Sequence, residues 1–251
     1  MTASDFVPSG REPTDQNAQK RAVAAAALAW ALPRLASDVV VGIGTGSTAD
    51  HFIDLLAPHA ARFAGAVASS SRSADRLRAG GVPVFDLDAV GELPFYVDGA
   101  DEINGGFEMI KGGGGALTRE KIVASAARTF VCIVDASKRV ERLGKFPLPI
   151  EVIPMARSHV MRRLEALART HGLAAPTMRI RTAADGAPFV TDNGNPIVDV
   201  SGWSIADAPA LEAAIGAIVG VVESGLFALR PADVLVVPEG GSIDTKERGA
   251  T

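Results

Sequence analysis

A short apolar run followed at once by a glycine-rich turn is the feature that most restricts how this chain can fold. Residues 39–43 are Val-Val-Val-Gly-Ile, a β-branched run typical of a strand that is buried on both faces. The turn Gly44-Thr45-Gly46 comes next, and residues 48–56 have the pattern of a helix. A buried strand that leads through a tight turn into a helix is typical of a parallel sheet covered by helices.

The same alternation of strand and helix continues along the chain. Further strands are predicted at 65–69, 82–85, 95–97, 130–134 and 232–237. Helices are predicted at 15–32, where Asp15 is a candidate N-cap, and at 73–79 and 117–128. We therefore expect an α/β fold with a doubly wound, mostly parallel, Rossmann-like sheet.

The pattern changes at residues 145–149, where Lys-Phe-Pro-Leu-Pro suggests a linker. Beyond it we expect extended segments at 150–153, 178–181, 188–191 and 197–200, a turn at 192–195, and helices at 156–171 and 208–218. These predict a smaller α+β domain at 148–223, placed at an oligomer interface, beside a catalytic domain formed by 1–147 and 224–251. The polar end, 240–251, is expected to be frayed.

Composition excludes several classes of protein. The chain has 251 residues and a formal net charge of −4 with both signs interspersed, so we expect neither a nucleic-acid nor a membrane partner. The single cysteine, Cys132, lies in an apolar run and is predicted to be a buried, inert thiol. The histidines lack the spacing of a metal site, and residues 1–17 lack the pattern of a signal peptide. A cytoplasmic protein is expected.

The turn Thr45-Gly46-Ser47-Thr48 is a candidate phosphate site. Its glycine lets the backbone approach an anion, and the following helix presents free N–H groups at its positive end. Ser47 stands where a dinucleotide-binding fingerprint needs a third glycine, and no Lys-Ser/Thr pair completes a Walker loop. The alternative is a tight turn with capping hydroxyls.

Two aspartates follow the strand predicted at 95–97. Asp98 falls where the strand ends, the position at which open α/β sheets collect ligands. Asp101 lies three residues later, and Gly99 permits a turn that brings both carboxylates toward one cleft. Close carboxylates raise the proton affinity of one of them, which favours acid–base chemistry. Metal binding and helix capping are the alternatives.

Lys111 precedes four consecutive glycines, residues 112–115, and Glu120 follows in the next helix. Ordering such a run on folding costs much conformational entropy, so it is rarely used unless the backbone must be exposed or unusually shaped. Its N–H groups can stabilise an oxyanion, and Lys111 adds a positive charge. Glu120 alone more often compensates a helix dipole. The segment Asp135–Lys138 and the serines 69–71 also follow strands, and either line the cleft or form polar loops.

Together these segments resemble the type A ribose-5-phosphate isomerase family. The resemblance rests on GIGTGST (42–48), YVDGADEI (96–103), KGGGGALTREKI (111–122), DASK (135–138) and FPLPIEVIPMA (146–156), in that order. Weaker likeness continues through VTDNGNPIVDV (190–200) and GLFA (225–228).

The resemblance implies an isomerase that interconverts D-ribose 5-phosphate and D-ribulose 5-phosphate in the non-oxidative pentose phosphate pathway. It implies no cofactor and no metal, a cytoplasmic location, and a homodimer or homotetramer. The catalytic residues that it implies are Glu120, Asp98, Asp101 and Lys111. Its substrate contacts correspond to Thr45, Gly46, Ser47, Thr48, Gly99, Ala100, Gly112, Gly113, Gly114, Lys138 and Lys20.

The expected mechanism is a proton transfer. Asp98, helped by Lys111, opens the sugar ring, and Glu120 moves a proton from carbon 2 to carbon 1 through a cis-enediolate. Lys111, a protonated Asp101 and glycine-loop N–H groups meet the negative charge. Two alternatives stay open. One is a sugar-phosphate-sensing module, and the other is a nicotinamide-dependent oxidoreductase. Ser47, at the position of the third fingerprint glycine, argues against the oxidoreductase.

Overall fold

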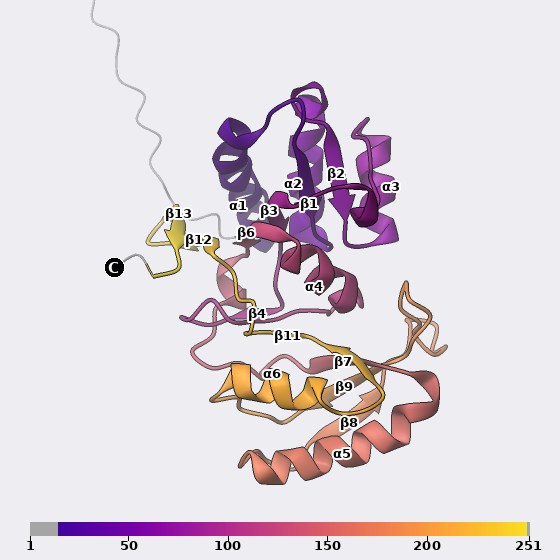
Figure 1. The fold of residues 1–251 in the computed structure, drawn as a ribbon. Helices are drawn as coiled ribbons and strands as arrows, with labels where there is room; N and C mark the ends of the chain where they lie inside the picture. The colour runs from indigo at the N-terminus through magenta and orange to yellow at the C-terminus, as the bar shows by residue number, and fades with distance from the viewer. Residues whose placement is uncertain (1–14, 250–251) are drawn as a thin grey trace, which may run out of the picture.

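The computed structural model describes residues 15–249, and its largest element is a six-stranded sheet in the order β13-β12-β6-β3-β1-β2 (Figure 1). The strands are β1 (Val40–Ile43), β2 (Gly65–Ala68), β3 (Leu93–Asp98), β6 (Ala127–Ile133), β12 (Val234–Glu239) and β13 (Ser242–Glu247). All neighbours are parallel except β13, which runs antiparallel to β12. The predicted doubly wound, mostly parallel sheet is confirmed.

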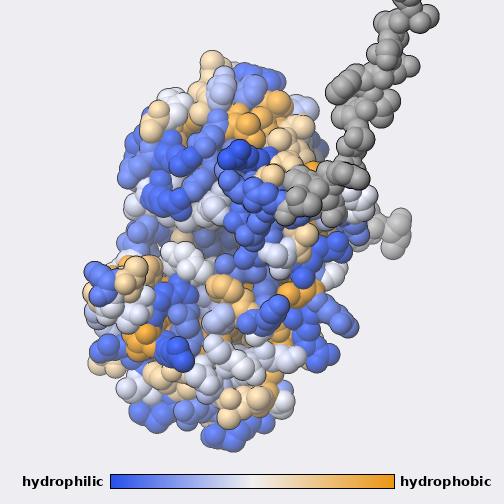
Figure 2. All heavy atoms as spheres, turned by 180° about the vertical axis from the view of Figure 1, so that it is seen from behind, coloured by the Kyte–Doolittle hydropathy of each residue, from blue (hydrophilic) through white to orange (hydrophobic). Residues whose placement is uncertain are grey.

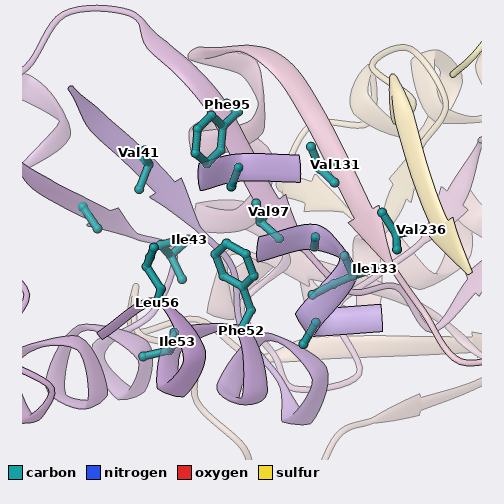
Figure 3. Close-up of a cluster of buried hydrophobic side chains, with 14 of the residues drawn as sticks. Val41, Ile43, Phe52, Ile53, Leu56, Phe95, Val97, Val131, Ile133 and Val236 are labelled. Atoms are coloured by element: carbon teal, nitrogen blue, oxygen red, sulfur yellow. The ribbon is translucent and has the colours of Figure 1, made fainter. Parts of the chain in front are cut away.

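Helices cover both faces of this sheet. Helices α1 (Gln16–Ala31) and α2 (Ser47–Leu56) pack on one face, and α4 (Leu117–Ser125) packs on the other. The strands alternate accordingly, since Val97 and Ile133 join the core under α2, whereas Tyr96 and Cys132 join the core under α4. Figure 3 shows Phe52 of α2 among the strand residues of the first core. Helix α3 (Ser71–Ala79) packs beside β2.

The order of the strands places a topological switch point at β1. The chain passes from β1 outward to β2, then returns to β3 on the other side of β1. Connections that leave β1 in opposite directions open a crevice at the carboxyl ends of the strands, where ligands bind in folds of this kind. The turn after β1 and Asp98 at the end of β3 therefore meet at one edge.

A second lobe is built on the antiparallel sheet β10-β7-β9-β8 (Figure 1). Its elements are β7 (Leu148–Val152), α5 (Arg157–Thr170), β8 (Thr177–Ile180), β9 (Ile197–Ser201), α6 (Ala208–Gly216) and β10 (Val221–Ser224). A small sheet between the lobes contains β4 (Glu102–Ile103), β5 (Met109–Ile110) and β11 (Leu226–Phe227). Short 3-10 turns are η1 (Leu32–Arg34), η2 (Ala57–Arg62), η3 (Leu87–Ala89), η4 (Ala136–Lys138) and η5 (Pro154–Ala156).

Several predicted elements differ from the structure. Residues 82–85 and 188–191 form only the single bridges Ala66–Val84 and Thr182–Pro188, not strands. The helix predicted to end at 128 ends at Ser125, because β6 begins at Ala127. The predicted linker at 145–149 already contains the start of β7, and the predicted frayed end contains β13.

Within residues 15–249, no helix combines the length and the apolarity that a bilayer span requires. Seen from behind, the surface is mainly hydrophilic, with apolar residues in small separate patches (Figure 2). The prediction about a signal peptide concerns residues 1–17, of which 1–14 lie outside the described part of the chain.

Candidate active site

A cavity of about 140 Å³ opens at the carboxyl edge of the parallel sheet. It is lined by Lys20, Thr45, Gly46, Ser47, Thr48, Gly99, Ala100, Asp101, Lys111, Gly112, Gly113, Gly114, Glu120 and Lys138. The structure thus brings together in one cavity every catalytic and substrate-contacting residue that the family resemblance implies, except Asp98, whereas the serines 69–71 do not line it.

The turn between β1 and α2 forms one wall of the cavity. Gly46 immediately precedes α2 with φ 117°, a backbone conformation that favours glycine, so the first N–H groups of the helix are presented to the cavity. The Thr45 hydroxyl contacts the hydroxyls of Ser69 and Ser70 at 2.9 and 2.8 Å. These buried serines do not line the cavity. They support the turn from behind.

Two lysines from distant parts of the chain face this turn. Lys20 comes from α1 and Lys138 from η4. Contacts between these elements hold both in place: the Gln16 amide donates to the Asp135 carboxylate at 3.3 Å, and the Gln19 side-chain oxygen accepts from Ala136 N–H at 3.1 Å. Two cations beside a helix N-terminus make this end of the cavity an anion site.

Asp98 lies beneath the floor of the cavity, with no exposed surface. Its Oδ1 accepts the backbone N–H groups of Thr45 and Gly99 at 2.9 and 2.7 Å. Its Oδ2 accepts the Lys111 ammonium at 2.7 Å and the hydroxyl of Tyr96. Four donors therefore occupy both oxygens, and a Cβ on Gly44 would lie 1.9 Å from the Asp98 carboxyl carbon. Asp98 is therefore a fully hydrogen-bonded side chain that ties the turn to Lys111.

Lys111 and Glu120 form a buried ion pair at the cavity. Both are buried, with side chains 3% and 5% exposed, and Lys111 Nζ lies 3.4 Å from Glu120 Oε2. Burial raises the pKa of Glu120 to about 8, against the opposing charge of Lys111. Burial acts to lower the pKa of Lys111, but Asp98 and Glu120 outweigh it, so the pKa of the lysine stays above its ordinary value. A carboxyl that titrates near neutrality beside a fixed ammonium is suited to accept and return a proton.

Asp101 lines the cavity and is hydrogen-bonded to the glycine loop, residues 112–115. Its Oδ2 accepts the N–H of Gly113 at 2.7 Å. A Cβ on Gly113 would lie 2.5 Å from Asp101 Oδ1, so glycine is needed for this close approach. Within residues 15–249, no cluster of three or more His, Cys, Asp or Glu residues is arranged to hold a metal ion.

Sequence reasoning missed Tyr96, Ser73 and Gln16. Tyr96 is fully buried and donates to Asp98, Ser73 donates to the carbonyl of Gly44 at 2.7 Å, and Gln16 holds the segment that carries Lys138. The only available signal was for Tyr96, whose hydroxyl must find a partner in a strand that is otherwise apolar.

The fold and the site define a doubly wound α/β protein whose cavity holds a buried Lys–Glu pair beside the glycine-containing turn at a helix N-terminus. Residues 65–241 match the family described as ribose 5-phosphate isomerase A (phosphoriboisomerase A). The crystal structure of ribose 5-phosphate isomerase A from Neisseria gonorrhoeae is 40% identical in sequence, with a TM-score of 0.83 over 94% of this chain and 99% of that one.

Two further solved structures of ribose 5-phosphate isomerases are similar to this chain. Ribose 5-phosphate isomerase A from Methanocaldococcus jannaschii is 36% identical, with a TM-score of 0.82 over 93% of this chain and 100% of that one. A D-ribose-5-phosphate isomerase in complex with phospho-erythronic acid is 33% identical, with a TM-score of 0.83 over 94% of this chain and 100% of that one. The chain belongs to the ribose 5-phosphate isomerase A family, whose enzymes interconvert ribose 5-phosphate and ribulose 5-phosphate.

Proposed function

We propose that Glu120 is the base of this isomerisation and that Lys111 stabilises the charge that it creates. Glu120 removes the proton from carbon 2 of ribose 5-phosphate and returns it to carbon 1. Between the two steps the substrate is a cis-enediolate, whose single negative charge lies next to the Lys111 ammonium. The hydroxyl proton moves from the oxygen of carbon 2 to the oxygen of carbon 1 at this stage, so that carbon 2 becomes the carbonyl carbon of the product. The buried pair, with 3.4 Å between Lys111 Nζ and Glu120 Oε2, is the observation that carries the proposal.

The phosphate group is placed by the other end of the cavity. The turn Thr45–Thr48 offers N–H and hydroxyl donors, and Lys20 and Lys138 add positive charge. Because both ends of the sugar phosphate are held, the reacting carbons are oriented toward Glu120.

Opening of the sugar ring needs a carboxyl that can reach the substrate. Asp98 was expected to serve here, but its oxygens already accept four donors and it does not line the cavity. We assign the ring-opening proton transfer to Asp101, which faces the cavity, and give Asp98 the role of holding Lys111 in its charged form.

Replacement of the base tests this proposal. Glu120→Gln keeps the shape of the side chain and removes its basicity, so kcat is expected to fall by at least about 10²-fold. Transfer of deuterium from solvent D₂O into recovered substrate, followed by NMR, should disappear in parallel. Glu141→Gln, at an exposed glutamate away from the cavity, is the matched control. Near wild-type turnover of purified Glu120→Gln would contradict the assignment.

We also propose a homodimer or homotetramer that acts in the cytoplasm. The support for an oligomer is the family resemblance together with exposed apolar side chains on the second lobe, where Met155 and Val219 are 93% and 83% exposed. Light scattering after size-exclusion chromatography measures the mass directly. A monomer at micromolar concentration would contradict the proposal, and a dimer or tetramer that Met155→Glu dissociates would support it.

A further inference from the structure

One arginine of the second lobe reaches into the first lobe and contacts the glycine loop. Arg181 follows β8, and its Nη1 donates to the carbonyl oxygens of Gly112 at 2.8 Å and Gly113 at 3.1 Å. Its side chain is only 13% exposed. The contact bridges 69 and 68 positions of sequence, so no local feature of either segment requires it.

The guanidinium is itself fixed in place. Asp199, on the neighbouring strand β9, accepts from Arg181 Nε at 2.9 Å and from Nη2 at 2.5 Å. The ring centroid of Phe189 lies 5.7 Å from the guanidinium carbon, and a Cβ on Gly115 would meet this ring at 2.3 Å. A bidentate ion pair holds a planar guanidinium in one orientation. Only Nη1 is then directed at the loop.

Peptide geometry turns this contact into a constraint on the cavity. In a trans peptide the carbonyl oxygen and the N–H of the next residue point in opposite directions, and the described chain contains no cis peptide bond. With the Gly112 carbonyl directed at Arg181, the N–H of Gly113 points the other way, where it donates to Asp101 at 2.7 Å. By the same rule the N–H of Gly114 points away from Arg181. Both glycines line the cavity.

We infer that Arg181 is a positioning residue for the isomerisation: it holds two peptide units of the glycine loop, so that the N–H of Gly113 stays on Asp101 and the N–H of Gly114 is directed toward the developing enediolate. The inference rests on the proposed function, because it supplies a donor for the charge that Glu120 creates. A donor on a peptide carbonyl also polarises the unit and strengthens its N–H as a donor. Oxyanion donors act through their preset orientation, so loosening the loop costs transition-state stabilisation rather than phosphate binding.

The test compares Arg181→Met with Arg179→Met, which changes an exposed arginine two positions earlier in β8. Four quantities are measured: kcat, KM, and the inhibition constants of phospho-erythronic acid and of inorganic phosphate. Phospho-erythronic acid carries a planar carboxylate that resembles the charged enediolate, whereas inorganic phosphate probes only the anion site.

For Arg181→Met, kcat is expected to fall by about 10- to 100-fold. Binding of phospho-erythronic acid should weaken by at least threefold, while KM and phosphate inhibition stay within about twofold of wild type. Arg179→Met should match wild type in all four quantities. An unchanged kcat, or equal weakening of both inhibitors, overturns the inference.

Arg181→Lys decides the question if the methionine variant does not fold. Lysine keeps the charge but loses the bidentate contact with Asp199, so the same selective loss is expected at a smaller size, and full activity overturns the inference. Failure of the proposed base is distinguishable, since an active Glu120→Gln protein would remove Glu120 from its role while leaving the Arg181 comparison intact.

Discussion

Burial raises the pKa of Glu120, the proposed base, to about 8. Lys111 acts in the opposite direction, and the negative charges of Asp98 and Asp101 add to the rise. Only the deprotonated carboxylate can accept the substrate proton. We therefore predict that kcat/KM rises with pH and reaches half of its plateau near pH 8, measured from initial rates at low substrate concentration.

Asp101→Asn provides a control for the cause of this shift. It removes one negative charge near Glu120, so the midpoint of the profile should move to lower pH even though the rate itself falls. A wild-type midpoint near the ordinary carboxyl value of 4.5 would contradict the assignment of this pKa to the catalytic base.

The sequence predicted the residues around the cavity, but it could not predict that Asp101 lines the cavity and Asp98 does not. Asp98 and Asp101 are equivalent in a sequence motif, and the spacing between them only indicates that they can approach each other. Their difference depends on Tyr96, Lys111 and the N–H of Thr45, which occupy Asp98 from three separate segments. Cys132, in contrast, was predictable: it is buried in the apolar core, where burial raises its thiol pKa to about 12.

At the scale of elements, two adjacent positions of the glycine loop, Gly113 and Gly114, differ in the space available for a side chain. A Cβ on Gly113 would lie 2.5 Å from Asp101 Oδ1, whereas one on Gly114 meets no atom within 4 Å. We predict that Gly113→Ala displaces Asp101 and lowers the thermal unfolding midpoint by several degrees, while Gly114→Ala leaves the midpoint within about one degree. Scanning calorimetry of both proteins makes the comparison, and equal midpoints would show that Asp101 can move without cost.

Elements with apolar side chains on both faces were predictable, and elements that depend on a partner were not. Residues 242–247 are polar apart from Ile243, yet they form β13 because each of them pairs with the edge of β12. Pro149 suggested a linker, but it lies near the start of β7, and its carbonyl still accepts from Gly225 N–H at 2.7 Å. In both places, hydrogen bonds to another segment decide the structure: β13 pairs with the strand just before it, and Pro149 with Gly225, which is distant in sequence.

At the scale of the whole molecule, the first lobe supplies the cavity residues and the second lobe contacts two of the elements that carry them. Cavity residues all come from the first lobe and its loops, but the second lobe fixes the glycine loop through Arg181 and helix α4 through a buried carboxylate. Helix α4 carries Glu120, so its position sets the position of the base. We therefore propose that the smaller lobe supports catalysis by holding these two elements in place.

That buried carboxylate, Glu151, is fully enclosed and accepts four side-chain donors. Thr118 of α4 donates at 2.5 Å, and the turn after Phe189 supplies Thr191 at 2.9 Å, Asn193 at 3.2 Å and Asn195 at 2.9 Å. In Glu151→Gln the amide oxygen can still accept from Thr191, Asn193 and Asn195, whereas the NH₂ group faces the Thr118 hydroxyl, which then has to accept instead of donating. The negative charge that strengthens all of these hydrogen bonds is lost.

Hydrogen bonds to a charged group are stronger than neutral ones by about 1 kcal/mol or more, so Glu151→Gln is predicted to lower the free energy of unfolding by about 1–3 kcal/mol in a denaturant titration. Because Thr118 lies in the same turn of α4 as Glu120, kcat should fall as well, by several-fold, with inhibition by inorganic phosphate unchanged. Glu165→Gln, at an exposed glutamate of α5, is the control and should match wild type in both measurements. If Glu151→Gln unfolds at the same denaturant concentration as Glu165→Gln and keeps full activity, the second lobe does not fix the base through this carboxylate, and its support of the site rests on Arg181.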